Sequence, residues 1–310
     1  MSATSAPPVR TLFFGSGTVA LPALRHLLQS DLVEIESVVT APPRPAGRKG
    51  LLRPTPVAEL AAEHELTVRT PRTLRDEAVQ AELRDVGAGL IVLADYGRII
   101  PAAILDMPRH GALNIHPSLL PRHRGAAPVV GTILAGDSVG GVTVMRMDEG
   151  LDTGPTVAQR EVTLDGSEVA PELEARLAEM GAELLIEVLP GWLDGRLQAM
   201  PQSAQGATLT RLLRREDGRL DPARPAAELE RQVRAYQPWP GSFLEHDDAR
   251  LKVWAATVLG QEVSVEPGVI VLTEGTLGLG TVDGVLRLDE VQPAGKRRMS
   301  GAQYRRGKRL

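Results

Sequence analysis

Two polar side chains alternate along one apolar segment, a spacing that suits acyl transfer. Asn114 and His116 lie in the run ALNIH (112–116), and residues two apart in a strand point to the same face. An amide can donate a hydrogen bond to an oxygen that gains negative charge, and an imidazole can take a proton near neutral pH. Taken singly, however, Asn114 equally suits a turn or a sheet edge, and a lone His is more often structural than catalytic.

A carboxylate follows in the glycine-rich turn MDEGLDTGP (147–155). Asp152 lies between Gly150 and Gly154, where the backbone can take angles that bring an acid close to a neighbour. An isolated Asp in such a segment is most often a turn former. Its position after an apolar run leaves a second interpretation open, in which Asp152 orients His116 or a bound water.

Three other kinds of site have weaker support. Ser118 adds a hydroxyl near His116, but the sequence has no G-x-S-x-G turn of the α/β hydrolases. The six histidines lack metal-ligand spacing and cysteine is absent, so we expect no metal. The turn GSGTVA (15–20) matches a dinucleotide fingerprint, but the next strand ends VVTA (38–41), without the acid that would hold a ribose.

The elements that must position these residues alternate between strand and helix. From about residue 10 to 193, short β-type runs and amphipathic helical runs follow each other, which predicts an α/β fold with a Rossmann-like parallel sheet. The proline-rich segment 41–56 breaks the pattern and predicts an irregular loop over a site. Strands are expected at 9–14, 35–40, 90–94, 112–116, 142–147 and 156–162. Helices are expected at 57–65, 76–86, 125–136 and 171–192.

A second, smaller domain is expected in the last hundred residues. Segment 195–210 is polar and loses periodicity, so we place a linker there, between domains at 1–194 and 211–310. After a helix at 226–235, short strands are punctuated by glycine, which suggests a small β-barrel such as the oligonucleotide-binding type. These strands are expected at 252–255, 268–273, 276–279 and 285–288.

Charge is unevenly placed along the 310 residues, whose formal net charge is −4. Residues 211–310 carry 17 Lys and Arg against 14 Asp and Glu, which indicates either a solvated surface or a basic face for a phosphate backbone. No apolar stretch approaches the roughly 18 residues of a membrane span. The first ten residues lack the order of a signal peptide, so we expect a cytoplasmic protein without membrane contact.

NIHPSLLP (114–121), RHRGAAPV (122–129) and several other motifs, in the correct order, resemble the methionyl-tRNA formyltransferase family. NIHPSLLP (114–121) is similar to the signature of folate-dependent formyltransferases, whose likeness extends over about residues 10–190. RHRGAAPV (122–129) is similar to the RWRGAAP form of the tRNA enzymes, and RPAGRKG (44–50) to their flexible loop that inserts into the acceptor stem. Three later segments resemble the family's tRNA-binding module: YQPWPGSF (236–243), LKVWAA (251–256) and VQPAGKRRMS (291–300).

The resemblance implies transfer of a formyl group from 10-formyltetrahydrofolate to the α-amine of methionyl initiator tRNA by a monomer. It places Asn114, His116 and Asp152 on the family's catalytic positions, with Asn114 at the formyl oxygen and Asp152 orienting His116. The residues expected beside folate are Tyr96, Gly97, Ser118, Leu119, Leu120 and Pro121. The residues expected to contact tRNA are Arg44, Arg48, Lys49, Lys296, Arg297 and Arg298.

Three positions depart from the family's usual pattern, and two alternatives stay open. FFGSGTVA (13–20) stands where a form like FxGTPxFA is usual, Asp95 stands where a small apolar residue is usual, and Val130 replaces a polar Gln. The alternatives are a formyltransferase for a small amine, such as glycinamide ribonucleotide or an amino sugar, and a non-catalytic RNA-binding protein. A basic second domain favours tRNA over a small amine, and the intact Asn114, His116 and Asp152 disfavour the non-catalytic reading.

Overall fold

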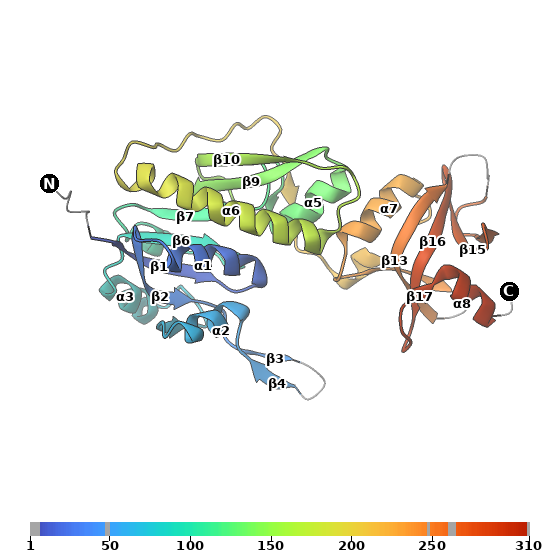
Figure 1. Cartoon of the computed structure of the whole chain (residues 1–310), viewed down its shortest axis with the longest axis horizontal. Coiled ribbons are helices and arrows are strands. Elements are labelled where there is room, and N and C mark those ends of the chain that lie inside the picture. Colours follow the sequence, from blue (N-terminus) through green and yellow to red (C-terminus); the bar gives the residue numbers. More distant parts are fainter. Residues whose placement is uncertain (1–6, 47–49, 247–248, 260–264, 309–310) are drawn as a thin grey trace. The chain divides into compact units, whose positions relative to one another are not determined.

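The computed structural model describes residues 7–46, 50–246, 249–259 and 265–308 (Figure 1). The chain forms two compact units. The first comprises Met1–Pro128, Gly140–Val162 and Glu174–Thr210, and the second comprises Val129–Val139, Thr163–Leu173 and Arg211–Leu310. The second unit therefore includes two short segments, 129–139 and 163–173, that precede its main part in the chain. None of the helices in the described residues is long and apolar enough to cross a membrane.

The first unit is built on a seven-stranded sheet of order β10-β9-β7-β6-β1-β2-β5. The pairs β5/β2, β2/β1, β1/β6 and β6/β7 are parallel, which confirms the predicted parallel arrangement for these five strands. The pair β7/β9 is antiparallel, so the sheet as a whole is mixed. The strands are β1 (Val9–Gly15), β2 (Val33–Val39), β5 (Val68–Arg69), β6 (Leu90–Ala94), β7 (Ala112–His116), β9 (Val139–Arg146) and β10 (Thr156–Thr163).

Helices cover both faces of this sheet. Apolar residues of α1, α2 and α6 join one core with alternate residues of the central strands, and α3 and α4 join the core on the other face. Figure 1 shows α6 lying across the sheet on the side of α1. Gly181 lets α6 approach closely, since a Cβ there would lie 2.5 Å from Ile115. The helices are α1 (Leu21–Leu28), α2 (Pro56–Glu63), α3 (Glu77–Asp85), α4 (Ala102–Leu105) and α6 (Ala170–Leu193).

The strand order changes direction between β1 and β6. From β1 the chain continues through α1 to β2 on one side, and β6 and β7 add on the other side. In open α/β sheets, ligands bind outside the carboxyl ends of the strands at such a switch point. The turn after β1 lies there: Ser16 donates its N–H to the carbonyl oxygen of Asp95, just after β6, at 3.0 Å.

The proline-rich segment after β2 is not wholly irregular, so that prediction was wrong. It contains a small antiparallel hairpin, β3 (Arg44–Ala46) paired with β4 (Leu51–Arg53), in which Arg44 lies opposite Arg53. A two-stranded ribbon uses one edge of each strand, so Pro45 is tolerated although it lacks an N–H donor. Residues 47–49 lie outside the described residues.

The second unit is an antiparallel sheet of order β12-β13-β16-β15-β14, with β17 paired to β16. Its core joins α7, the strands and the C-terminal helix α8, and includes Leu229, Leu251 and Tyr304. The expected small β-module is confirmed as an antiparallel sheet, and closure into a barrel stays a prediction. The strands are β12 (Ser242–His246), β13 (Ala249–Leu259), β14 (Ile270–Thr273), β15 (Thr276–Thr281), β16 (Gly284–Pro293) and β17 (Met299–Ser300). The helices include α5 (Pro128–Ala135), α7 (Ala226–Ala235) and α8 (Gly301–Lys308).

Candidate active site

Strand β7 places two polar side chains at the carboxyl end of the sheet. Leu113 and Ile115 belong to the core on the face of α1 and α6, so the alternating Asn114 and His116 point to the opposite face. Asn114 is half-buried and lies between Leu93 of β6 and Met145 of β9. His116 is buried and ends the strand. The predicted pairing of amide and imidazole on one face is therefore present.

The ring of His116 lies between a carbonyl and a carboxylate. Its Nε2 is 2.9 Å from the carbonyl oxygen of His123, and its Nδ1 is 3.7 Å from Oδ2 of Asp152. Because a carbonyl oxygen only accepts, Nε2 carries the hydrogen in the neutral ring, which leaves Nδ1 as the basic nitrogen. Burial lowers the pKa of His116, and the Asp152 carboxylate and the hydrogen bond to His123 oppose this effect only in part. His116 is therefore a neutral base at neutral pH.

Asp152 is held in place through both its side chain and its backbone. Its Oδ2 accepts the N–H of Gly125 at 2.7 Å, and its φ of 52° lies in the left-handed region, which Asp tolerates better than most residues. The side chain of Gln202 donates to the carbonyl oxygens of Asp152 and Gly154, at 2.9 and 2.7 Å. The turn therefore presents its carboxylate to His116 in a defined orientation.

Arg124 and Gln202 support this turn and were missed by the sequence analysis. Arg124 donates to Oε1 of Gln202 through Nε and Nη2, at 3.0 and 2.7 Å, which fixes the amide that holds Asp152. Gln202 lies in segment 195–210, the predicted linker, and this segment is part of the first compact unit. There, β11 (Leu209–Thr210) pairs with β8 (Arg124–Gly125). Only the RHRGAAPV motif gave a sequence signal for Arg124, and nothing pointed to Gln202.

The segment after β7 is tied down by its own hydrogen bonds. The hydroxyl of Ser118 donates to the carbonyl of Arg122 at 2.7 Å, and Thr143 donates to the carbonyl of Ser118 at 2.7 Å. Thr143 Oγ1 also accepts the N–H of Leu120 at 3.1 Å. Because the Ser118 hydroxyl is buried and donates to a backbone carbonyl rather than to His116, it is not arranged as a nucleophile.

The residues expected beside folate come together at the same sheet edge. Tyr96 and Gly97 follow β6, and residues 118–121 follow the adjacent parallel strand β7. Tyr96 is buried edge-on against Phe14, with ring centroids 5.2 Å apart, and its hydroxyl has no hydrogen-bond partner. Gly97 has open space around the position of a Cβ. The carboxyl end of β6 thus combines the apolar rings of Phe14 and Tyr96 with a hydroxyl that has no hydrogen-bond partner.

The residues expected to contact tRNA differ in exposure and in whether their charged groups already contact other residues of the protein. Arg44 begins β3 and is exposed, whereas Arg48 and Lys49 lie outside the described residues. Lys296 and Arg297 are exposed in the turn before β17. Arg298 stacks on Trp254, with its Cζ 3.3 Å from the ring centroid, and lies 3.9 Å from a carboxylate oxygen of Glu290. Its charge is therefore partly engaged within the second unit.

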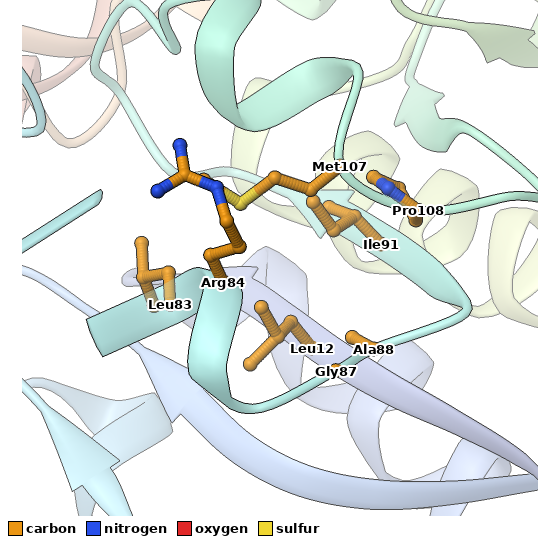
Figure 2. Close-up of a pocket in the computed structure, with 8 residues that line it drawn as sticks. All are labelled: Leu12, Leu83, Arg84, Gly87, Ala88, Ile91, Met107 and Pro108. Atoms are coloured by element: carbon orange, nitrogen blue, oxygen red, sulfur yellow. The ribbon is translucent and has the colours of Figure 1, made fainter. Parts of the chain in front are cut away.

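A cavity elsewhere in the first unit contains none of these residues. The cavity has a volume of about 220 Å³ and lies between α3 and the segment after α4, on the face opposite α1. Figure 2 shows the residues that line it. Its lining is mainly apolar, with the side chain of Arg84 at the edge, and we assign it no chemistry. In the described residues no group of three or more His, Asp or Glu could hold a metal ion. The lining residues are Leu12, Leu83, Arg84, Gly87, Ala88, Ile91, Met107 and Pro108.

Gly125 donates its N–H to the Asp152 carboxylate, and replacing it with alanine should destabilise the fold. Gly125 has a φ of 100°, and a Cβ there would lie 2.2 Å from the carbonyl oxygen of Thr210. Gly206 has a φ of 80° but open space, so Gly206→Ala is a matched control for backbone strain alone. We expect urea unfolding to show Gly125→Ala less stable than Gly206→Ala by about 1–3 kcal/mol. Equal stability of the two variants would contradict this account.

Two solved structures resemble the chain in fold. An N-formyltransferase from Helicobacter canadensis, solved in complex with folinic acid and dTDP-3-aminofucose, has a TM-score of 0.68 at 15% identity over 92% of this chain and 99% of that one. HypX from Aquifex aeolicus, solved with tetrahydrofolic acid, has a TM-score of 0.61 at 19% identity over 96% of this chain and 47% of that one. At these identities the likeness shows the fold alone.

Sequence relatives cover almost the whole chain. Residues 9–189 match the formyl transferase family, and residues 212–309 match the formyl transferase C-terminal domain. A methionyl-tRNA formyltransferase of Chloroflexus aggregans is 43% identical over 301 residues, 96% of this chain and 97% of the relative. Those of Roseiflexus castenholzii and Gluconobacter oxydans are 43% and 42% identical over 97% and 96% of this chain and 97% of each relative. The chain therefore belongs to the methionyl-tRNA formyltransferase family.

Proposed function

We propose that the protein transfers the formyl group of 10-formyltetrahydrofolate to the α-amino group of methionyl initiator tRNA. The observation that carries this proposal is the 43% identity to a methionyl-tRNA formyltransferase over 301 residues, which span both compact units. A relative that shared only the sheet unit would not distinguish tRNA from a small amine. The paired His116 and Asp152 beside Asn114 supply the groups that such a transfer needs.

In this reaction the neutral amine attacks the formyl carbon, and the carbonyl oxygen takes up negative charge in a tetrahedral intermediate. Asn114 donates a side-chain N–H to that oxygen and stabilises the developing charge. The attacking nitrogen loses a proton, N10 of the folate gains one, and the bond between the formyl carbon and N10 breaks. An α-amino pKa of roughly 7.7–8 leaves a useful neutral fraction of the acceptor at neutral pH.

His116 assists the proton movements and the stabilisation of the oxyanion. Its lowered pKa keeps the ring neutral before attack, so Nδ1 is available to take a proton. The Asp152 carboxylate, 3.7 Å from Nδ1, then stabilises the imidazolium. Asp152 thus acts on the reaction through His116, and Gly125 and Gln202 keep it oriented.

Folate, as co-substrate, would lie along the edge formed by Tyr96, Gly97 and residues 118–121. Support comes from the adjacent carboxyl ends of β6 and β7, the open space at Gly97 and the unsatisfied Tyr96 hydroxyl.

We propose that no metal takes part. A monomeric state, a cytoplasmic location, and the division into a catalytic domain 1–194, a linker 195–210 and a tRNA-binding domain 211–310 stay predictions.

Charge reversal in the turn before β17 should weaken tRNA binding selectively. Lys296 and Arg297 are exposed, whereas Arg298 is engaged with Trp254. For the double variant Lys296→Glu, Arg297→Glu we expect KM for tRNA to rise about tenfold or more and the salt dependence of binding to become shallower, because phosphate contacts are lost. KM for folate should stay unchanged. The control is Arg75→Glu, a charge reversal at an exposed position in the first unit. Equal increases in KM for tRNA and for folate in the double variant would contradict a selective role in tRNA binding.

The choice of acceptor is tested by presenting two amines to the same enzyme. With labelled 10-formyltetrahydrofolate, we expect label to reach charged initiator tRNA and not glycinamide ribonucleotide. Transfer to the small amine instead would show that the role of the second unit is misassigned. Binding of tRNA without any transfer would favour a non-catalytic RNA-binding protein.

A further inference from the structure

The glycine turn after β1 has no role in the proposed reaction. Residues 15–20 match a fingerprint whose N–H groups, at the start of a helix, usually bind phosphate. Here the turn leads through a short 3₁₀ helix, η1 (Thr18–Ala20), into α1. It also lies at the switch point between β1 and β6, where ligands of such sheets bind. The turn therefore has the form and the position of an anion site.

In this chain a carboxylate already occupies the turn. The N–H of Gly17 donates to the side chain of Asp95, and the N–H of Ser16 donates to the Asp95 carbonyl at 3.0 Å. A Cβ on Gly17 would lie only 1.9 Å from Oδ2 of Asp95, so the carboxylate lies directly against the glycine. Asp95 holds this position with a φ of 47°. Its oxygen thus takes the place that a phosphate oxygen would need.

The charge of this carboxylate adds to its steric effect. Burial raises the pKa of Asp95 to about 6, although the hydrogen bond from Gly17 opposes the shift, so the group is ionised at neutral pH. The residue nevertheless remains accessible to solvent, so its charge is presented at the protein surface rather than in the core. Glu174 of α6 lies close enough for the Asp95 charge to raise its pKa, after the larger effect of burial. An approaching anion would therefore meet two acidic groups.

The strand register places Asp95 beside the strand that carries Asn114 and His116. On β6, Leu93 pairs with Asn114, and Ala94 pairs with both Ile115 of β7 and Gly15 of β1. Asp95 is the next residue, so it stands at the carboxyl edge between the glycine turn and the end of β7. A phosphate bound at the turn would consequently lie next to the candidate active site.

We propose that Asp95 is a specificity-determining residue that closes the glycine turn to anions, and thereby keeps phosphate-bearing small amines and nucleotides away from the carboxyl ends of β1 and β6. It acts in two ways: its oxygen takes the N–H of Gly17, and its charge repels phosphate. The inference goes beyond the proposed function, because it concerns the ligands that are excluded from this end of the sheet.

Titration with inorganic phosphate, followed through the backbone amide signals of Gly17 and Thr18, tests the inference directly. The wild type should show no saturable shift. Asp95→Ala should show a saturable shift and bind phosphate at least about tenfold more tightly, since it loses both the occupying oxygen and the charge. Asp95→Asn keeps an oxygen that can accept from Gly17 without the charge, and should bind phosphate with intermediate affinity. Asp85→Ala, an exposed change at the end of α3, should behave like the wild type.

Two results would overturn the inference. One is saturable phosphate binding at Gly17 in the wild type, and the other is its absence in both Asp95 variants. If Asp95→Ala does not fold, the nearly isosteric Asp95→Asn decides, because the loss of charge alone must increase phosphate affinity. Failure of the proposed function would show separately, as absence of formyl transfer to tRNA by the wild type, and would leave the phosphate titration interpretable.

Discussion

Alanine in place of His116 is expected to lower kcat for formyl transfer about 10²- to 10⁴-fold, the usual contribution of a positioned acid or base. The change removes Nδ1, the nitrogen that faces Asp152, and leaves the Asp152 turn supported by Gly125 and Gln202. KM for tRNA should change little, because His116 is buried at the end of β7. Steady-state kinetics with both substrates checks this result, and a loss confined to KM would contradict it.

The pH profile separates a catalytic His116 from a merely structural one. Its pKa lies below the ordinary imidazole value of about 6.5, so His116 should take up its proton, and kcat should fall, only at pH values below that. Asp152→Asn removes a group that raises this pKa, so the acid limb should move to still lower pH while kcat drops. A limb that stays in place in Asp152→Asn would mean that another group controls it.

Replacement of Asn114 by alanine is expected to lower kcat about 10²- to 10³-fold, as the removal of one oxyanion donor typically does. Asn114 is half-buried at the sheet edge, so its loss leaves the adjacent core residues Leu113 and Ile115 in place. Asn114→Asp is the matched variant: it keeps the shape but places a negative charge where the oxyanion forms, and it should lose at least as much activity as Asn114→Ala.

The measurement for Asn114 is the ratio of the effects on kcat and on KM for folate. A role in the transition state lowers kcat and kcat/KM alike. A rise in KM for folate with unchanged kcat would make Asn114 a binding residue only. Thermal melting of both variants serves as the control, and we expect melting temperatures close to that of the wild type because no core contact is removed.

The local sequence pattern was sufficient to predict the bounds of an element where that element is buried on both faces or strongly amphipathic. The strands at 90–94 and 112–116 and the helix at 226–235 were predicted to the residue, because their apolar periods coincide with their burial. The helix expected at 125–136 begins only at Pro128, because Gly125 pairs with Thr210, more than eighty residues away. No local signal reports a partner at that distance.

The candidate site shows the same division between local and distant information. Strand alternation placed Asn114 and His116 on one face. The glycine-rich turn after an apolar run offered Asp152 as a partner of His116, the resemblance favoured that interpretation, and the fold brings the carboxylate to within 3.7 Å of the ring. The supports of that pair come from elsewhere: the amide of Gln202 and the carbonyl of His123. Likewise, Asp95 was visible as a departure from the family pattern, but its contact with Gly17 depends on the pairing of β1 with β6.

The most direct test of the account is a single-turnover measurement of formyl transfer, with enzyme in excess over charged initiator tRNA and folate saturating. Wild type and His116→Ala are compared, together with the affinity of each for the tRNA. We predict a rate for His116→Ala at least about a hundredfold lower at unchanged tRNA affinity, which places the loss in the chemical step. An unchanged single-turnover rate, or a loss explained wholly by weaker tRNA binding, would contradict the assignment of this site.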